Sequence, residues 1–228
     1  MKIMKTMLAA GIAALAFAAL PAFASAVEVD YPGEGTITAS TPGPATLRSD
    51  SDSITCKVTN EANEELPAVT VRGKFTSKTT GDIEFTFHGC KDELGFNCTS
   101  SGQSTGTITT EELTFHIVKL TNGKAGMLVT PNANGVFANF TCAGFIGVEV
   151  QGNGVLGEIT EPGYNEESSA FSVNFAAVSN TEQVNTMYEG NETTYGLKAS
   201  IGGGEFEPVA EEASGTGEFT EGKGTITP

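Results

Sequence analysis

Apolar and polar side chains alternate along most of this chain from residue 53 onward. In residues 69–76 the apolar positions are Val69, Val71 and Phe75, with polar side chains at most positions between them, and residues 83–88 alternate in the same way. A period of two is typical of strands that bury one face. Similar runs occur at 104–109, 111–120, 124–130, 135–142, 145–151, 153–160, 169–178, 193–201 and 215–227. The pattern therefore predicts an all-β chain.

Short turn signals separate these runs. Asn122-Gly123 and Asn134-Gly135 suit the type I′ turn of a β-hairpin, which needs positive φ at both central residues. Many short strands joined by tight turns indicate an antiparallel β-sandwich or barrel, between which the pattern does not choose. Helix is scarce, since only 61–66 and 208–213 could each form one short turn.

The N-terminal residues have the three zones of a secretory signal. Lys2 and Lys5 precede an apolar run at 7–20, and Ala24-Ser25-Ala26 offers the small side chains that the signal peptidase requires. We expect residues 1–26 to be a signal peptide, and the protein to be secreted and extracellular. No later window has 18 consecutive apolar residues, so no membrane span is expected.

The exported part divides into two segments by composition. Residues 27–52 are rich in Pro, Gly, Ser and Thr and are predicted to form an extended leader or an edge strand, because proline cannot donate to a sheet ladder. Residues 53–228 are predicted to form a single all-β domain, a length that all-β folds often reach undivided.

The chain is strongly acidic. Its formal net charge is −16, which becomes −18 when Lys2 and Lys5 leave with the signal peptide. Such a charge repels nucleic acid and favours a soluble monomer. The acidic residues are spread along the chain with small clusters such as Glu211-Glu212, and we interpret them as a solvated surface.

Four cysteines lie in the exported part, where disulfides persist. Four cysteines allow three pairings, and the sequence does not fix which one forms. The seven residues between Cys90 and Cys98 form a short polar connection that could close at the base of a loop, leaving Cys56 to pair with Cys142. We prefer this pairing. A zinc site is disfavoured because CxxC spacing is absent and the chain has two histidines.

No catalytic constellation emerges. Residues 102–106 fit GxSxG, but a strand-like run follows instead of a helix, and His116 is the only later histidine, with no Asp beyond Asp92. Both His88 and His116 fall among polar strand positions and are interpreted as surface groups. Paired glutamates could hydrolyse a polysaccharide, yet 28 acidic residues identify no particular pair. We therefore assign no catalytic residue.

Calcium is the most plausible ion for a protein outside the cell. The oxygen-rich segment Ser49-Asp50-Ser51-Asp52-Ser53 lacks the spacing and the glycine of a calcium loop, and a polar loop is the simpler interpretation. No cofactor and no metal-binding residue is therefore assigned.

Several short motifs occur in order along the exported part of the chain. They include Phe87-His-Gly-Cys90, Cys98-Thr-Ser100, Gly106-Thr-Ile-Thr-Thr110, Phe137-Ala-Asn-Phe-Thr-Cys142, Val148-Glu-Val-Gln-Gly152 and Gly203-Gly-Glu-Phe-Glu207. Together these motifs resemble a family of secreted β-rich proteins of soil actinobacteria. The resemblance covers about residues 53–228 and implies an exported, cysteine-containing, β-rich domain of bacterial origin. It implies no activity, ligand or catalytic residue.

These observations lead to one hypothesis with two alternatives. The leading hypothesis is a non-enzymatic extracellular β-domain that binds or coats something at the cell envelope, with envelope or extracellular polysaccharide as the expected partner. The alternatives are a polysaccharide hydrolase with paired glutamates, and a small-molecule carrier if the strands close into a barrel. The 14 phenylalanines fit an apolar cavity and fit the core of a sandwich equally well.

Overall fold

The computed structural model describes residues 27–31, 33–41, 43–61, 64–132 and 134–228. Strands and their connections make up this described part, which contains no helix. The all-β prediction is therefore confirmed. The predicted signal peptide, residues 1–26, lies outside the described residues.

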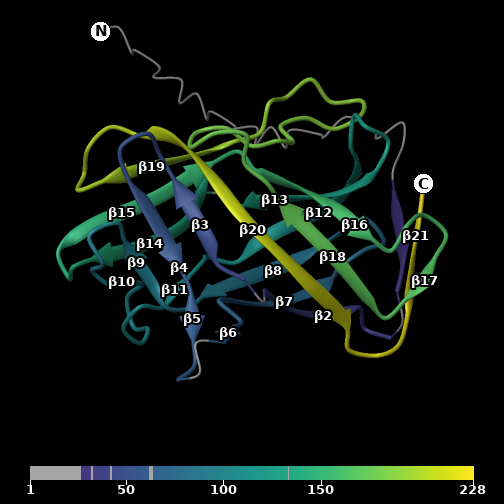
Figure 1. Ribbon diagram of the computed structural model, residues 1–228. Coiled ribbons are helices and arrows are strands. Elements are labelled where there is room, and N and C mark those ends of the chain that lie inside the picture. Colours follow the sequence, from purple (N-terminus) through teal and green to yellow (C-terminus); the bar gives the residue numbers. More distant parts are fainter. Residues whose placement is uncertain (1–26, 32, 42, 62–63, 133) are drawn as a thin grey trace, which may run out of the picture.

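Eight antiparallel strands close into a barrel (Figure 1). Each strand pairs with the next one in chain order, and the last pairs back with the first. Of the two architectures that the alternation left open, the barrel is the one that forms. Its strands are β2 (Thr36–Thr41), β7 (Val69–Phe75), β8 (Thr80–Phe87), β12 (Leu113–Lys119), β13 (Ala125–Pro131), β16 (Val155–Glu161), β18 (Ala170–Phe175) and β20 (Glu207–Phe219).

The alternating side chains fill this barrel from within. On β7 the buried positions are Val69, Val71 and Phe75, which are the apolar members of the alternation. The barrel strand β20 carries small residues at inward positions, where a phenylalanine ring from β18 fills the space. A Cβ atom at Gly217 would lie 2.3 Å from the Phe171 ring, so only glycine fits there.

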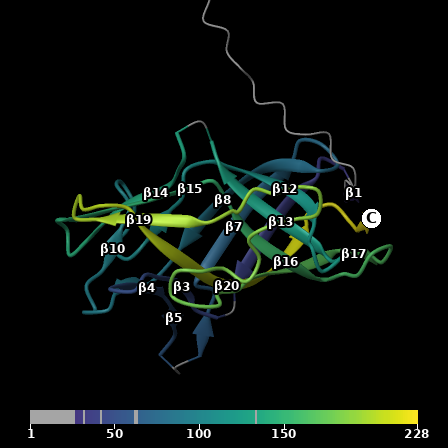
Figure 2. The same cartoon turned by 90° about the horizontal axis from the view of Figure 1, so that it is seen from above.

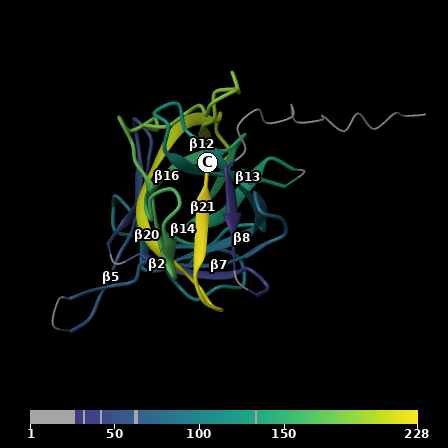
Figure 3. The same cartoon turned by 90° about the vertical axis from the view of Figure 1, so that its right-hand side faces the viewer.

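A small sheet covers one end of the barrel. It consists of β1 (Glu28–Asp30), β21 (Gly224–Thr227) and β17 (Glu167–Ser168), and Figure 3 shows β1 and β21 crossing in front of the barrel. Val29 and Ile226 of this sheet are buried. Tyr31 stacks on Phe75 of β7 with ring centroids 4.7 Å apart. These contacts join β1 and β21 to the barrel core.

The other end of the barrel continues into a second ring of strands, which shares the long strand β20. Figure 2 shows the two groups of strands side by side along the molecule. This ring pairs in the order β20-β3-β4-β9, then β10-β14-β15-β19 and back to β20, and one bridge between Lys91 and Asn97 joins β9 to β10. Its strands are β3 (Ala45–Arg48), β4 (Ser53–Cys56), β9 (Cys90–Asp92), β10 (Cys98–Thr99), β14 (Val136–Cys142), β15 (Ile146–Gly152) and β19 (Leu197–Ile201).

Three short strands complete the fold. β11 (Ile108–Thr109) pairs with the end of β8, while β5 (Val58–Thr59) and β6 (Glu65–Leu66) form a separate two-stranded sheet that projects from the body (Figures 2 and 3). On the outer face of β12, β13 and β16, the 176–196 connection covers a small apolar cluster that contains Leu120, Tyr188 and Tyr195.

Residues 27–52 differ from the predicted leader or edge strand. They supply β1, β2 and β3, and β2 pairs with β7 on one side and with β20 on the other. The edge-strand prediction is therefore wrong for β2. Pro44, which the structure describes, lies between β2 and β3 and so takes no donor from a sheet ladder.

The predicted disulfide pairing is also wrong. The structure joins Cys56 to Cys90 and Cys98 to Cys142, and the described residues contain no free cysteine. Each pair consists of directly opposed residues on neighbouring strands, β4 with β9 and β10 with β14. Cys90 and Cys98 lie close in the sequence, yet cross-strand register and not sequence distance brings sulfur atoms together.

Candidate functional site

Two apolar cavities lie within the fold, the larger inside the second ring and the smaller inside the barrel. The larger has a volume of about 80 Å³ and the smaller about 50 Å³. Both exceed the space that one water molecule needs, whereas most protein interiors have few voids of that size. Phe87 and Glu211 line both cavities, so these two side chains stand at the junction.

The larger cavity is almost wholly apolar. Ala45, Leu47 and Ile54 come from β3 and β4, while Phe137, Ala138 and Phe140 come from β14 on the opposite side. Aromatic and aliphatic walls with few polar groups are typical of small-molecule sites. The remaining lining residues are Thr46, Cys56, Phe87, Ile108, Thr110, Val150, Leu197 and Glu211.

Glu211 is the charged exception in this wall. Along β20 the positions 209, 211, 213, 215 and 217 face inward, because successive side chains of a strand point to opposite faces. Protein atoms surround the carboxyl group of Glu211, yet the side chain is still partly accessible to a water-sized probe. Because Glu211 lines both cavities, we infer that this accessible part faces the cavities.

The carboxyl group of Glu211 has no partner. Within the described residues it makes no hydrogen bond and no ion pair, although its backbone oxygen accepts a bond of 2.9 Å from Gln183 Nε2. Burial raises the pKa of Glu211 to about 7, because a charge in an apolar surrounding loses its hydration. A carboxyl group that is surrounded by protein, lacks a partner and has a raised pKa is a candidate for a functional residue.

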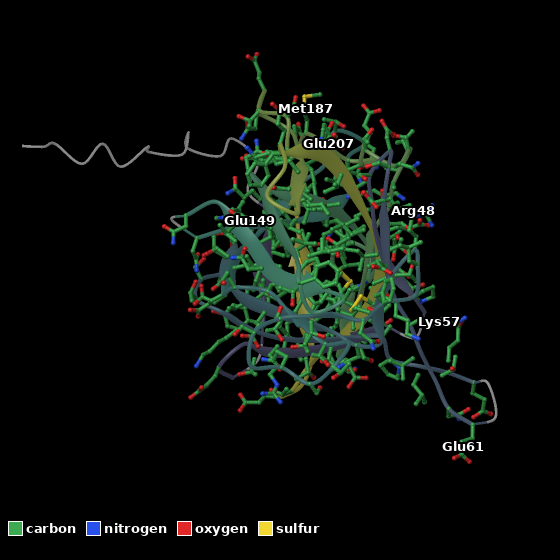
Figure 4. The ribbon with its side chains drawn as sticks, turned by 90° about the vertical axis from the view of Figure 1, so that its left-hand side faces the viewer. Arg48, Lys57, Glu61, Glu149, Met187 and Glu207 are labelled. Carbon is green, nitrogen blue, oxygen red and sulfur yellow. A yellow bond between two sulfur atoms is a disulfide. The ribbon has the colours of Figure 1, made fainter. Side chains whose placement is uncertain are left out.

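The charged groups next to Glu211 face away from the cavities. Arg48 Nη2 lies 3.3 Å from Glu212 Oε2, and both side chains are about half exposed on the outer surface. Figure 4 looks into the second ring and shows Arg48 and Lys57 at its outside. Asp92, opposite Ile54 in the sheet, accepts hydrogen bonds from the backbone N–H groups of Leu94 and Phe96. None of these groups compensates the Glu211 carboxylate.

The sequence pattern does not identify Glu211 as a buried residue. Its composition predicts a solvated surface for Glu211 and Glu212, and a short helical turn for 208–213. The structure corrects both points, because 208–213 belongs to β20 and only Glu212 is exposed. The available signal was the phase of the strand, since Val209 and Ala213 flank Glu211 on the face that carries Gly217 and Phe219.

The other sequence candidates stay apart from the cavities. Ser104 of the GxSxG match bonds to Thr107 Oγ1 at 3.0 Å, in a turn that leads into β11. His88 Nε2 lies 3.2 Å from Thr70 Oγ1 on the surface. His116 is half-buried instead of exposed, and burial lowers its pKa. The structure brings none of these groups together with Glu211.

The segment predicted as the best calcium candidate is a turn. Ser49 is buried, and its Oγ accepts hydrogen bonds from the backbone N–H groups of Ser51 and Asp52. Across the described ranges, no three His, Cys, Asp or Glu residues gather in a way that could hold a metal ion. Calcium binding by this segment therefore stays untested.

The hydrolase alternative needs two carboxylates on either side of a scissile bond. Among the residues that the structure describes, Glu211 is the only acidic side chain lining either internal cavity. Elsewhere Glu34 and Glu158 have lowered pKa values because each bonds to a lysine, Lys74 and Lys124 respectively. These two carboxylates are paired with cations and do not supply a general acid.

Comparisons with protein-family models, with curated proteins and with solved structures find no match to this chain. The resemblance to secreted proteins of soil actinobacteria therefore stays a prediction. In the described residues, no helix has the length and apolar character to cross a membrane.

Proposed function

We propose that this chain is a non-enzymatic binding protein of the extracellular space that holds a small, mostly apolar molecule inside its fold. The observation that carries the proposal is the apolar cavity of about 80 Å³ inside the second ring of strands. The closed barrel is compatible with a carrier, and two disulfides favour an oxidising, extracellular environment. Export itself rests on the signal peptide predicted at residues 1–26.

The energetics of the cavity support a binding role. At about 24 cal/mol per Å³, a void of about 80 Å³ lowers stability by about 2 kcal/mol relative to a filled core. Larger side chains at Ala45 or Ala138, which line the void, would remove much of this cost. An apolar cavity with aromatic walls, kept at such a cost, is suited to a ligand.

Xenon provides a test that assumes no ligand chemistry, because it enters dry apolar cavities. Crystals of the purified protein pressurised with xenon are expected to show xenon density beside Phe87, Phe137 and Phe140. The Ala45→Val variant, which narrows the same cavity, is expected to lose it. Absence of xenon from both cavities of the unmodified protein would contradict the proposal.

Binding at the cell envelope is a second candidate function, and exposed apolar side chains favour it. Leu94, Phe96 and Phe145 are 76%, 51% and 79% exposed. They lie on two neighbouring loops that a hydrogen bond of 3.1 Å joins, from Ala143 N to the Asn97 oxygen. Exposed apolar groups gathered on adjacent loops are typical of interaction sites.

Sedimentation with isolated envelopes tests this second function. The purified protein is expected to pellet with the envelopes, and replacement of Leu94, Phe96 and Phe145 by serine is expected to release it. A chelator added in parallel tests whether calcium takes part. If the unmodified protein stays in the supernatant, envelope binding is wrong, and the cavity proposal is unaffected.

A further inference from the structure

We propose that Glu211 anchors the ligand of this cavity, and that the ligand class is a small aliphatic amine whose ammonium group pairs with the Glu211 carboxylate. The hydrocarbon part of the amine would pack against Phe87, Phe137 and Phe140. This inference rests on the proposed function, since it names the chemistry of the molecule that the cavity holds.

The placement of Glu211 is the first argument. Its side chain lines both cavities, from the centre of the one strand that the two rings share. Its neighbour in register on β3 is Leu47, which is apolar. Any molecule that fills either cavity therefore contacts the Glu211 side chain.

The lack of a partner is the second argument. Across the described chain, the carboxyl group of Glu211 makes no hydrogen bond or ion pair. Buried carboxylates are normally paired or hydrogen-bonded, because removal from water costs several kcal/mol. A partner that arrives with the ligand would supply the missing interaction.

The chemistry of the wall selects an amine over other ligands. An ionised carboxylate only accepts hydrogen bonds, so its complement is a donor that also carries positive charge. Ca²⁺ takes six to eight oxygen ligands, whereas Thr46 and Thr110 supply the hydroxyls in the wall of the larger cavity. The Oγ1 of Thr110 already accepts a hydrogen bond from the Phe85 N–H group. An anion would be repelled by Glu211.

Protein atoms surround the Glu211 carboxyl group, so folding has already removed much of its hydration. A ligand ammonium therefore gains the full attraction of the Glu211 carboxylate while only its own hydration is lost. A neutral hydroxyl group of the same size forms a weaker hydrogen bond to the same oxygen atoms. The cavity should thus distinguish an amine from the alcohol of equal shape.

The cavity volumes limit the ligand to about five non-hydrogen atoms. Benzene occupies a cavity of about 150 Å³, or roughly 25 Å³ per carbon atom. On this scale a void of about 80 Å³ takes about three atoms, and the void of about 50 Å³, which shares Phe87 and Glu211 with it, takes about two more. Isobutylamine and isobutanol have this size and differ in charge.

The experiment compares these two probes by NMR titration of the purified protein at pH 8, in about 150 mM salt to screen exposed carboxylates. We expect isobutylamine to bind about tenfold or more tightly than isobutanol, with the largest shifts at cavity-lining residues. The variant E211Q is expected to lose this preference and to keep its affinity for isobutanol. The variant E218Q, altered on the exposed face of β20, is expected to behave like the unmodified protein.

Each contrary result has a distinct meaning. Equal or tighter binding of isobutanol in the unmodified protein would overturn the amine inference and leave the binding function intact. An amine preference that persists in E211Q would overturn the role of Glu211. If neither probe binds while xenon enters the cavity, the ligand class is wrong. If xenon is excluded as well, the proposed function itself fails.

Discussion

Replacement of Glu211 by glutamine should change how the stability of the protein depends on pH. The pKa of Glu211 is raised from 4.5 to about 7 in the folded protein, so the folded state binds more protons than the unfolded state between these values. Stability therefore falls as pH rises through this window and levels off above pH 7. Below pH 4.5 the group is protonated in both states and contributes nothing.

The size of the effect follows from the same two pKa values. They differ by about 2.5, and each pKa unit corresponds to about 1.4 kcal/mol, so ionised Glu211 destabilises the fold by about 3 kcal/mol above pH 7. Most of this loss, about 2 to 3 kcal/mol, falls between pH 5 and pH 8. Glutamine has nearly the same shape and does not ionise, so E211Q should lack this loss.

Urea unfolding at pH 5 and pH 8, with the disulfides intact, measures the effect. From pH 5 to pH 8, the free energy of unfolding of the unmodified protein should fall by about 2 to 3 kcal/mol relative to that of E211Q. His116, whose pKa burial lowers, contributes the opposite dependence, but equally in both proteins. The control E218Q should keep the dependence of the unmodified protein. Identical dependence in the unmodified protein and E211Q would refute the placement of a buried, unpaired carboxyl group.

Three further predictions concern the fold. G217A should destabilise the protein by about 1 to 3 kcal/mol in urea unfolding, because its Cβ would lie 2.3 Å from the Phe171 ring, and unchanged stability would contradict that contact. Replacing Cys56 and Cys90 together by serine should cost about 4 kcal/mol, since their bridge closes a loop with a sequence separation of 34, and mass spectrometry of the unreduced protein should find the peptide of Cys56 linked to that of Cys90. Burial raises the pKa of Tyr195 to about 12, so alkaline titration monitored by tyrosinate absorbance should show a late-titrating group that Y195F lacks, and complete titration by pH 11 would contradict this.

The alternation of side chains located most of the strands. The runs at 111–120 and 124–130 correspond to β12 and β13, because a period of two reports directly which residues face the core. The run at 215–227 was expected to be continuous, whereas β20 ends at Phe219 and β21 begins at Gly224. Positive φ at Gly222 marks the turn between them.

Long-range pairing could not be predicted from the same pattern. Closure of β20 on β2 joins segments about 180 residues apart, and alternation within each strand carries no information about its neighbour. The disulfides show the same limit. Cys56 and Cys90 become opposed only through the register of β4 and β9. Proximity in sequence favoured Cys90 and Cys98 and was misleading.

Glu211 was overlooked for a local reason. The pair Glu211-Glu212 has the composition of a solvated surface. Because successive side chains of a strand point to opposite faces, however, Glu211 points inward and Glu212 points to the solvent. The inward phase becomes visible once Val209, Ala213 and Gly217 are assigned to the same face. An acidic residue in phase with apolar strand positions is therefore a sequence signal for a buried carboxyl group.

A crystal structure of the purified protein with isobutylamine, grown near pH 8, tests the central claim most directly. We expect density for the amine in the cavity beside Phe87 and Phe137, with its nitrogen within hydrogen-bond distance of the Glu211 carboxylate. An empty cavity, or an amine bound only at surface carboxylates, would contradict the anchoring of an amine by Glu211.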